Sequence, residues 1–193
     1  MKKSKKNRTK IYLIVGILLT CLVGILLFVF LNDSNENNNG NNLDVSYEND
    51  KTVLISNRLP MTDLAGMQLT GEGTKDDIQG YVEFSIKSTT DKKQDYSIYL
   101  NERKVNAPIN DRHVRLYLTD FNDNPYDGFK SNIIPCYEDF KVLKDSPSDK
   151  ILFSGVLNGN EKKNFRLRVW VSDTYTLRDS EETFSFDVKV KGE

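Results

Sequence analysis

The sequence predicts an all-β fold: an antiparallel β-sandwich of about seven to nine strands, Ig-like or jelly-roll-like, preceded by one N-terminal transmembrane helix. Three observations support this prediction. An apolar run without charges lies near the N-terminus, several later segments alternate between apolar and polar residues, and turn-forming residues separate those segments. No crossover helices are available to connect parallel strands, which excludes a parallel α/β fold.

Residues 11–31 are predicted to be the membrane-spanning helix. The stretch from Ile11 to Phe30 contains no charge, no proline and no amide side chain. At about 1.5 Å per residue, a helix of roughly 20 residues crosses the ~30 Å hydrocarbon core. A cleaved leader has a shorter apolar region, roughly 7–15 residues, and ends at a small-residue cleavage site, which "LLFVFLND" lacks. We therefore expect an uncleaved signal anchor whose partner is the lipid bilayer.

Charge sets the expected orientation. Six Lys and Arg residues precede the span and no acidic residue does. The positive-inside tendency then keeps the N-terminus in the cytoplasm. The predicted location is a bacterial cell membrane, crossed once, with the C-terminal domain extracellular. The remaining 21 basic residues, which are the 27 of the chain less these six, face 28 acidic ones. This balance disfavours a nucleic-acid partner.

A small-residue face lies within the predicted span. Gly16, Thr20 and Gly24 follow one another at four-residue spacing on one side of a helix. Small residues at this spacing let two membrane helices approach closely. We interpret this face as a helix-packing site for self-association or docking; the alternative is that glycine is simply common in membrane helices.

Composition divides the chain into four parts: a cytoplasmic basic tail (1–10), the transmembrane helix (11–31), a flexible Asn-rich linker (32–50) and an extracytoplasmic β-sandwich domain (51–193). The stretch "NDSNENNNGNN" at the start of the linker has no apolar residue, so it cannot bury surface to offset its chain entropy.

The two cysteines are not expected to pair, because Cys21 lies in the predicted span and Cys136 in the outer body. The domain must then be held by its core alone. We interpret Cys136 as a buried small apolar group rather than a reactive thiol.

Five segments alternate strictly between apolar and polar residues, which is typical of strands with one buried face. Their apolar positions are Val82, Phe84 and Ile86; Tyr96, Ile98 and Leu100; Val114, Leu116 and Leu118; Phe165, Leu167, Val169 and Val171; and Phe184, Phe186, Val188 and Val190.

Weaker strand patterns occur in "TVLIS", "KILFSGVL" and "EDFKVL". The stretches "STTDKKQ", "DFNDNPYDG", "DSPSD" and "NGNEKK" supply the Gly, Pro, Asn and Asp of tight reversals. One stretch, "MTDLAGM", could form a helical turn, with Asp63 in its first turn.

In the order in which they occur, "ISNRLPMTDLAG", "YVEFSIKSTTDKKQDYSIYLNE", "HVRLYLTDFNDNP", "ILFSGVLNGNEKKNFRLRVWVSD" and "ETFSFDVKV" resemble a group of membrane-anchored surface proteins of low-GC Gram-positive bacteria. The most specific parts are the segment from Pro60 to Gly66 and the Arg168–Trp170 region. More distantly, the chain is similar to the TasA/camelysin family of β-sandwich fibre and surface proteins. The cleavable leader usual in that family is missing here, and the resemblance implies no catalytic residue.

An aromatic and cationic stripe is the first candidate site. Its residues take the polar phase of the alternating segments, so they should face away from the core. They are Tyr99, Arg115, Tyr117, Arg166, Arg168 and Trp170. On neighbouring strands, such groups could stack on sugars or anchor a protein partner. The alternative is cross-strand pairing that stiffens a partly covered sheet.

The second candidate is a metal site in "DFNDNPYDG", where Asp120, Asn122 and Asn124 alternate and Asp127 follows. Calcium prefers such oxygen-rich loops, but the glycine and acidic residue of an EF-hand are not at their positions. A plain hairpin turn uses the same residue types, so we expect no cofactor and keep calcium as the alternative.

An enzyme is not expected. His113, the only histidine, is predicted to open a strand at the surface, and no nucleophile elbow, phosphate loop or paired-cysteine site occurs. The chain is predicted to be a non-enzymatic, membrane-anchored cell-surface protein with a structural, adhesive or assembly role.

Its expected partners are a second copy or another surface protein, with the segment "SYENDKTVLIS" as a strand donated to a neighbour's sheet edge. The alternatives are a module that binds wall polysaccharide or another extracellular ligand, and an accessory subunit of a membrane complex.

Overall fold

The protein is described by a computed structural model over residues 42–71, 80–130 and 132–192. The chain divides into two compact units, Met1–Gly40 and Asn41–Glu193, and the described residues all belong to the second. The predicted span at 11–31, with its Gly16, Thr20 and Gly24 face, lies outside the described residues. Within those residues, no helix has the length and apolar character needed to cross a membrane.

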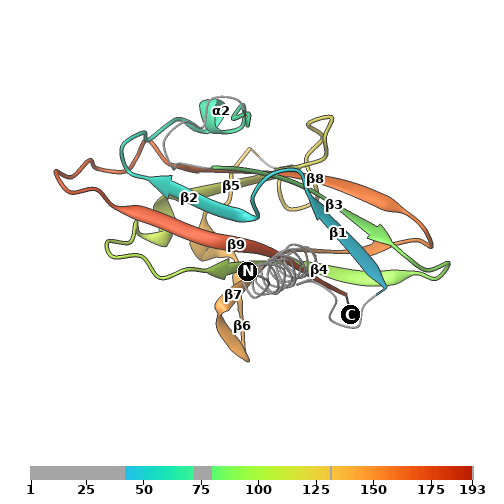
Figure 1. Cartoon of the computed structure of the whole chain (residues 1–193). Coiled ribbons are helices and arrows are strands. Elements are labelled where there is room, and N and C mark those ends of the chain that lie inside the picture. Colours follow the sequence, from blue (N-terminus) through green and yellow to red (C-terminus); the bar gives the residue numbers. More distant parts are fainter. Residues whose placement is uncertain (1–41, 72–79, 131, 193) are drawn as a thin grey trace, which may run out of the picture. The chain divides into compact units, whose positions relative to one another are not determined.

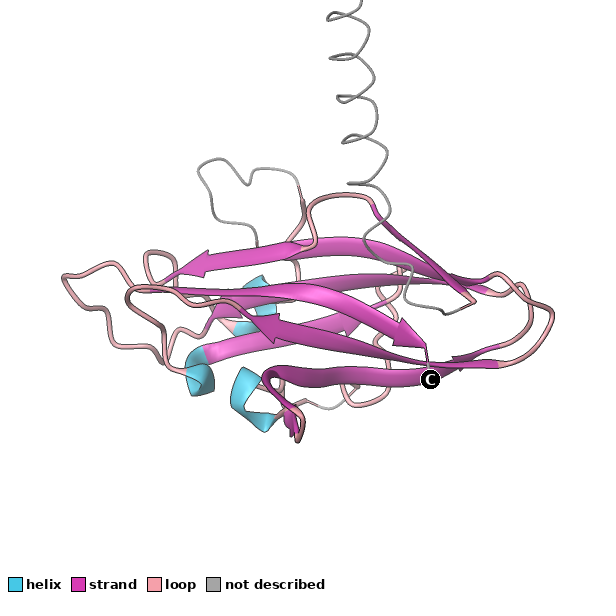
Figure 2. Cartoon of the chain, turned by 60° about the horizontal axis from the view of Figure 1, so that its bottom comes forward, coloured by secondary structure: helices cyan, strands magenta, loops and turns pink. Residues whose placement is uncertain are grey.

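Two antiparallel sheets form the body of the second unit, as the sequence predicts (Figure 1). The first sheet has the order β1 (Leu43–Tyr47), β3 (Tyr81–Ser88), β8 (Lys162–Val171) and β5 (Val114–Thr119). The second has the order β2 (Thr52–Ser56), β9 (Thr183–Gly192), β4 (Gln94–Glu102), β7 (Ser146–Leu157) and β6 (Lys141–Leu143). Figure 2 shows that strands dominate this unit and helices contribute only short turns.

The core lies between the sheets and is built from the alternating apolar positions. Val82, Phe84 and Ile86 of β3 are fully buried, and the predicted apolar positions of β4, β5 and β8 are buried as well. Aromatic rings form the centre: the ring centroids of Phe84 and Phe165 lie 5.1 Å apart in a stacked arrangement. The burial of these positions confirms the predicted hydrophobic alternation. Burial of this apolar surface is also the main driving force for folding.

The first strand begins nearer the N-terminus than the composition predicts. β1 lies within residues 32–50, which were expected to be linker, so the folded body begins before residue 51. β1 pairs with β3, whereas β2 pairs with β9 in the other sheet. Most of the segment proposed as a donated strand, residues 46–56, is therefore already paired within its own domain.

The weaker patterns are confirmed in outline. The stretch "KILFSGVL" forms the last eight residues of β7, and "EDFKVL" spans parts of the 3-10 turn η2 (Tyr137–Asp139) and of β6. The predicted helical turn is α2 (Asp63–Gly66), in which Ala65 N–H donates to the side chain of the N-cap residue Thr62. His113 does not open a strand but ends the 3-10 turn η1 (Asp111–His113), and β5 starts one residue later.

The two ends of the sandwich differ. At one end β1 begins, and the β3–β4 and β7–β8 turns meet there, where Asn160 N–H donates to Thr90 O over 2.8 Å. At the other end β8 finishes, ten residues or about 30 Å further along the strand. This second end carries the long connections 57–62, 103–113 and 172–182, and we call it the loop end (Figure 1).

Two leucines test which parts of the chain carry the stability. Leu167 is fully buried in β8, whereas Leu177 is 65% exposed at the loop end. We expect Leu167→Ala to lower the free energy of unfolding by about 2–5 kcal/mol, because it removes buried methyl groups and leaves a cavity. The matched change Leu177→Ala should stay within about 0.5 kcal/mol.

Urea unfolding of the full chain, followed by Trp170 fluorescence, measures both variants, because Trp170 is the only tryptophan. Equal losses in the two variants would contradict the assigned core.

Candidate functional site

Three loops are tied together at the loop end by backbone and side-chain hydrogen bonds. Asn57 Nδ2 donates to Ser180 O over 3.0 Å, joining 57–62 to 172–182. Ile109 N–H donates to Thr183 O over 3.0 Å and Thr183 N–H to Ala107 O over 2.8 Å, so 103–113 runs alongside the start of β9. These contacts give long connections a defined geometry, which a binding surface needs.

Glu182 is the buried polar centre of this junction. Its carboxylate accepts hydrogen bonds from Tyr175 Oη at 2.5 Å and from Arg178 Nη1 at 3.0 Å. Its backbone N–H donates to Asn57 Oδ1 over 3.1 Å. A buried carboxylate requires such partners, since its charge is otherwise costly to desolvate. Glu182 thus holds the 172–182 loop against the β2 end.

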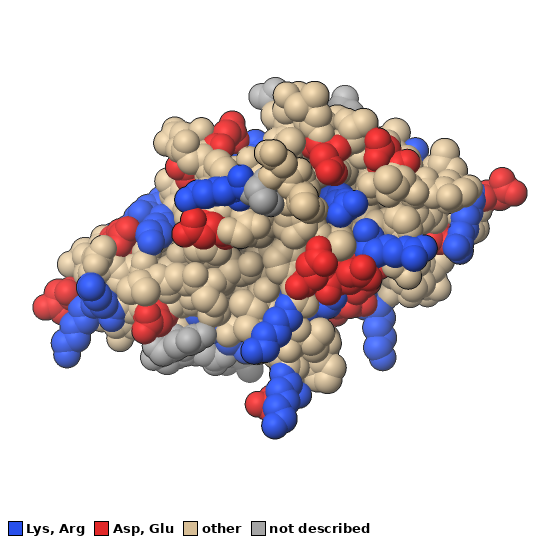
Figure 3. Space-filling view, turned by 180° about the vertical axis from the view of Figure 1, so that it is seen from behind, with Lys and Arg blue, Asp and Glu red and all other residues tan. Residues whose placement is uncertain are grey.

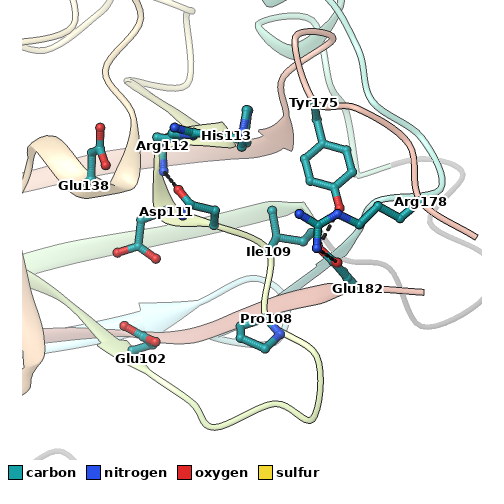
Figure 4. A pocket seen from close by; sticks show the side chains of 11 residues that line it. Glu102, Pro108, Ile109, Asp111, Arg112, His113, Glu138, Tyr175, Arg178 and Glu182 are labelled. Atoms are coloured by element: carbon teal, nitrogen blue, oxygen red, sulfur yellow. Dashed lines mark hydrogen bonds and ion pairs between the residues drawn. The ribbon is translucent and has the colours of Figure 1, made fainter. Parts of the chain in front are cut away.

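A pocket of about 650 Å³ opens beside Glu182. Its walls come from the end of β4, from residues 108–113, from η2 and from the 172–182 loop. Figure 4 shows Tyr175, Arg178 and Glu182 on one side, with the carboxylates of Glu102, Asp111 and Glu138 on the other. The volume falls within the range typical of small-ligand sites, roughly 300–1,000 Å³.

The acidic side of the pocket is only partly neutralised. Lys150, whose side chain is buried, donates to Asp111 Oδ2 over 3.1 Å and to Tyr137 O over 2.8 Å. Burial raises the pKa of Glu102 above its usual value, and the nearby Asp111 adds to this rise. A positively charged group entering the pocket would relieve this repulsion.

His113 stands at the rim as a hydrogen-bond acceptor. Its Nε2 accepts from Arg112 Nε over 3.1 Å, and its ring packs edge-on against Tyr175. Desolvation lowers the pKa of His113, and Arg112 and Arg115 lower it further, so the ring is mainly neutral near pH 7. In the described part of the chain no hydroxyl or thiol is hydrogen-bonded to it.

The described residues contain no group of three or more His, Cys, Asp and Glu side chains arranged to hold a metal ion. In the predicted calcium loop, Asp120 Oδ1 accepts from the backbone N–H groups of Asn122 and Asn124 at 2.8 and 2.9 Å. Asp127 is turned to Lys130 at 2.7 Å. Asp120 and Asp127 are thus engaged in local contacts, the first within the turn and the second with Lys130.

The predicted aromatic and cationic stripe is largely assembled on the outer face of the first sheet. The register pairs Arg115 with Trp170, Tyr117 with Arg168, and Thr119 with Arg166. Tyr99 lies on β4 in the other sheet, so it does not join them. Trp170 and Arg168 are buried, at 1% and 3% exposure.

A strap formed by residues 61–71 covers the buried end of this stripe. Gly66 of α2 lies against the Trp170 indole so closely that a Cβ atom there would be 2.1 Å from Trp170 Cδ2. Arg168 Nε donates to Leu69 O over 2.7 Å. The stripe is therefore a packing surface in this structure, and Arg115, Tyr117 and Arg166 are only partly exposed.

Asp123 completes the cover from the other side. It has a positive φ of 62°, and its Oδ1 accepts from Arg166 Nη1 and Arg168 Nη2, both at 2.7 Å. Hydrogen bonding by Arg168 is the main cause of its lowered pKa, and Arg166 contributes.

Cys136 is buried, as predicted. Its Sγ donates to Asp139 Oδ2 over 3.0 Å. Burial, together with that carboxylate, raises the pKa of the thiol to about 11. The thiol is thus protonated at neutral pH and is a poor nucleophile.

Comparison of the chain with protein-family models, with curated proteins and with solved structures gave no match. The site is therefore assigned from geometry alone. Sequence reasoning did not single out Glu102, Glu138, Tyr175, Arg178 or Glu182. One signal could have found Tyr175, Arg178 and Glu182: the polar connection at 172–182, like that at 103–113, is longer than a tight hairpin turn, and long ordered loops are often functional.

The network around Asp123 predicts a pH-dependent stability. Its pKa is lower in the folded than in the unfolded state, so its contribution is present above the unfolded value near 3.9 and is lost as pH falls through the folded pKa. We expect Asp123→Asn to lower the free energy of unfolding at pH 7 by roughly 1–2 kcal/mol, because buried Arg168 loses a charged acceptor. The high exposure of Asp123, 61% for its side chain, keeps this figure modest.

Thermal unfolding of the two proteins from pH 7 down to pH 2 measures this difference, which should shrink below about pH 4. The control is Asp179→Asn, which removes an exposed carboxylate from the loop end. A difference that stays constant over the whole pH range would refute the role of the Asp123 charge.

Proposed function

We propose that the protein is a single-pass, membrane-anchored surface protein whose extracytoplasmic β-sandwich acts by binding, with the loop-end pocket as its contact site. The observation that carries the proposal is the placement of that pocket. It lies at the far end of the sandwich from Leu43, where the chain from the N-terminal segment enters β1. The finer fold class, Ig-like or jelly-roll-like, stays a prediction, as does the TasA/camelysin likeness.

The chemistry of the pocket supports binding rather than catalysis. It combines four carboxylates, two guanidinium groups, an imidazole and a phenol ring. The Tyr175–Glu182–Arg178 arrangement is fixed by hydrogen bonds before any ligand arrives, which reduces the entropy cost of binding. Mixed charges of this kind suit a polar ligand, such as an extracellular polymer or a surface protein.

Surface charge argues against a nucleic-acid ligand. On the face shown in Figure 3, acidic and basic side chains lie intermingled rather than segregated. Nucleic-acid binding needs a continuous basic area that tracks the phosphates. The proposed ligand is therefore not a nucleic acid, in agreement with the acidic balance of the chain outside its basic tail.

Charge-swap variants of the pocket test the binding role. Arg112 and Glu138 both line it and are exposed, so Arg112→Glu with Glu138→Lys reverses the local charges and leaves the net charge unchanged. We expect retention of the full chain on isolated cell envelopes to fall at least about fivefold, since one such charge contact is worth roughly 1 kcal/mol.

The matched control is Lys92→Glu with Asp95→Lys, an exposed pair near the opposite end. It should be retained like the unchanged protein. Equal retention of all three proteins would remove the pocket from consideration.

Protease treatment tests the proposed topology. Arg103 and Lys104 are exposed in a long connection, so they should be cut readily by trypsin. We expect trypsin added to intact cells to cleave the full-length protein, while a cytoplasmic marker stays whole. Protection in intact cells, with cleavage only after lysis, would place the domain on the wrong side of the membrane for this proposal.

A further inference from the structure

The edge strands of the two sheets are protected to different degrees. The edge of β5 is covered by residues 125–126 and 135–136: Leu116 N–H donates to Pro135 O and Tyr126 N–H to Leu118 O, both over 3.1 Å. β6 has only three residues, includes Lys141 and has a shifted register against β7. Short length, lysine and irregular pairing are all known protections of sheet edges.

β2 is also partly closed. Thr52 N–H donates to the side chain of Asp50 over 3.0 Å, and Ser56 Oγ accepts from Arg58 N–H. The first bond occupies an outward backbone donor of this five-residue strand, whereas the second uses only the side chain of its last residue. β2 therefore loses one outward backbone donor to its own turn.

β1 has none of these protections in the described part of the chain. Thr89 N–H donates to Asn42 O and Glu48 N–H to Glu83 O, which sets the phase of the β1–β3 ladder. In that phase the backbone groups of even-numbered residues point to β3, and those of Leu43, Val45 and Tyr47 point away from it. β1 contains no proline, no lysine and no register shift.

We propose that β1 is a homotypic docking edge, which pairs in antiparallel orientation with β1 of a second copy about a two-fold axis at Val45. In this register Leu43 lies opposite Tyr47 of the second copy, Val45 opposite Val45, and Asp44 opposite Ser46. About six backbone hydrogen bonds would then join the two first sheets.

The side chains of β1 complement those of a second copy in this register. Other antiparallel registers also let the backbone groups of Leu43, Val45 and Tyr47 pair with the second copy. Shifting the second copy to the nearest such register in one direction places Asp44 opposite Asp44. The next register in the other direction places Asp44 opposite Glu48. Like charges directly opposite each other are destabilising, so only the register centred on Val45 matches apolar to apolar and acid to hydroxyl.

The contact is small. Five residues a side bury much less than the roughly 1,000 Å² of a stable interface, so the dimer is weak in dilute solution. Confinement of both copies to one surface raises their effective concentration and favours the dimer. This pairing is independent of the loop-end pocket, and either proposal can fail alone.

Cysteine cross-linking of the full chain in lipid vesicles tests the register. In a background with Cys21→Ser and Cys136→Ser, one tagged copy carries Asp44→Cys and an untagged copy carries Ser46→Cys. The two positions face each other at a non-hydrogen-bonded pair, where Cα atoms lie about 4.5 Å apart, within disulfide range. Oxidation should join the mixed copies at least about fivefold more than either variant alone. No mixed product, or equal yields in all samples, would overturn the proposal.

A pair of proline variants separates association from folding. Val45 N–H points away from β3, so Val45→Pro removes no hydrogen bond within the domain, whereas Ser46→Pro removes one to Ser85. Sedimentation of the full chain in detergent over a range of concentrations should show that Val45→Pro weakens association at least about tenfold with a nearly unchanged Tm. Ser46→Pro should lower the Tm. An unchanged protein that is monomeric at every concentration, or undiminished association of Val45→Pro, would contradict the docking edge.

Discussion

The buried guanidinium of Arg168 is the constraint on which the first sheet depends. Only 4% of its side chain is exposed, and a charge in that position is strongly destabilising without partners. Its three acceptors come from three separate parts of the chain: Leu69 O in the strap, Thr119 Oγ1 in β5 and Asp123 Oδ1 in the following turn. Satisfying this one group therefore fixes the strap and the turn on the outer face of the sheet.

That arrangement leaves the sandwich with one covered face and with a pocket at the loop end. The strap and the Asp123 turn cover the aromatic and cationic stripe, so large polar and aromatic groups there stabilise the domain. The long loops are instead gathered around Glu182, whose buried carboxylate accepts from Tyr175 and Arg178 and whose backbone N–H donates to Asn57 Oδ1. The same rule, that a buried charge must collect partners, thus shapes both the closed face and the open pocket.

Alternation in the sequence predicted the fold well and the site poorly, for a physical reason. Whether a strand residue faces inward follows from its immediate neighbours, because side chains alternate along a strand. Whether the outward face is exposed to solvent does not follow from neighbouring residues, because the strap that covers Trp170 lies about 100 residues earlier in the chain. The stripe therefore has the pattern of an exposed binding surface, and only tertiary structure shows that it is covered. The pocket was not predicted, because its residues come from three loops and show no periodic pattern in the sequence.

The β1–β2 junction explains how one stretch serves both sheets and leaves an edge open. Asn49 closes the β1 ladder by imitating a backbone partner: its Nδ2 donates to Tyr81 O and its Oδ1 accepts from Glu83 N–H, both over 3.0 Å. The chain then crosses to the second sheet and runs beside β9, where Val188 N–H donates to Lys51 O. This change of sheet divides residues 43–56 into two strands of five residues, β1 and β2. Each edge is therefore short, and short edge strands limit open-ended association. A short edge of this kind favours a closed pair over an open fibre, since antiparallel pairing of β1 uses up the edge of both copies.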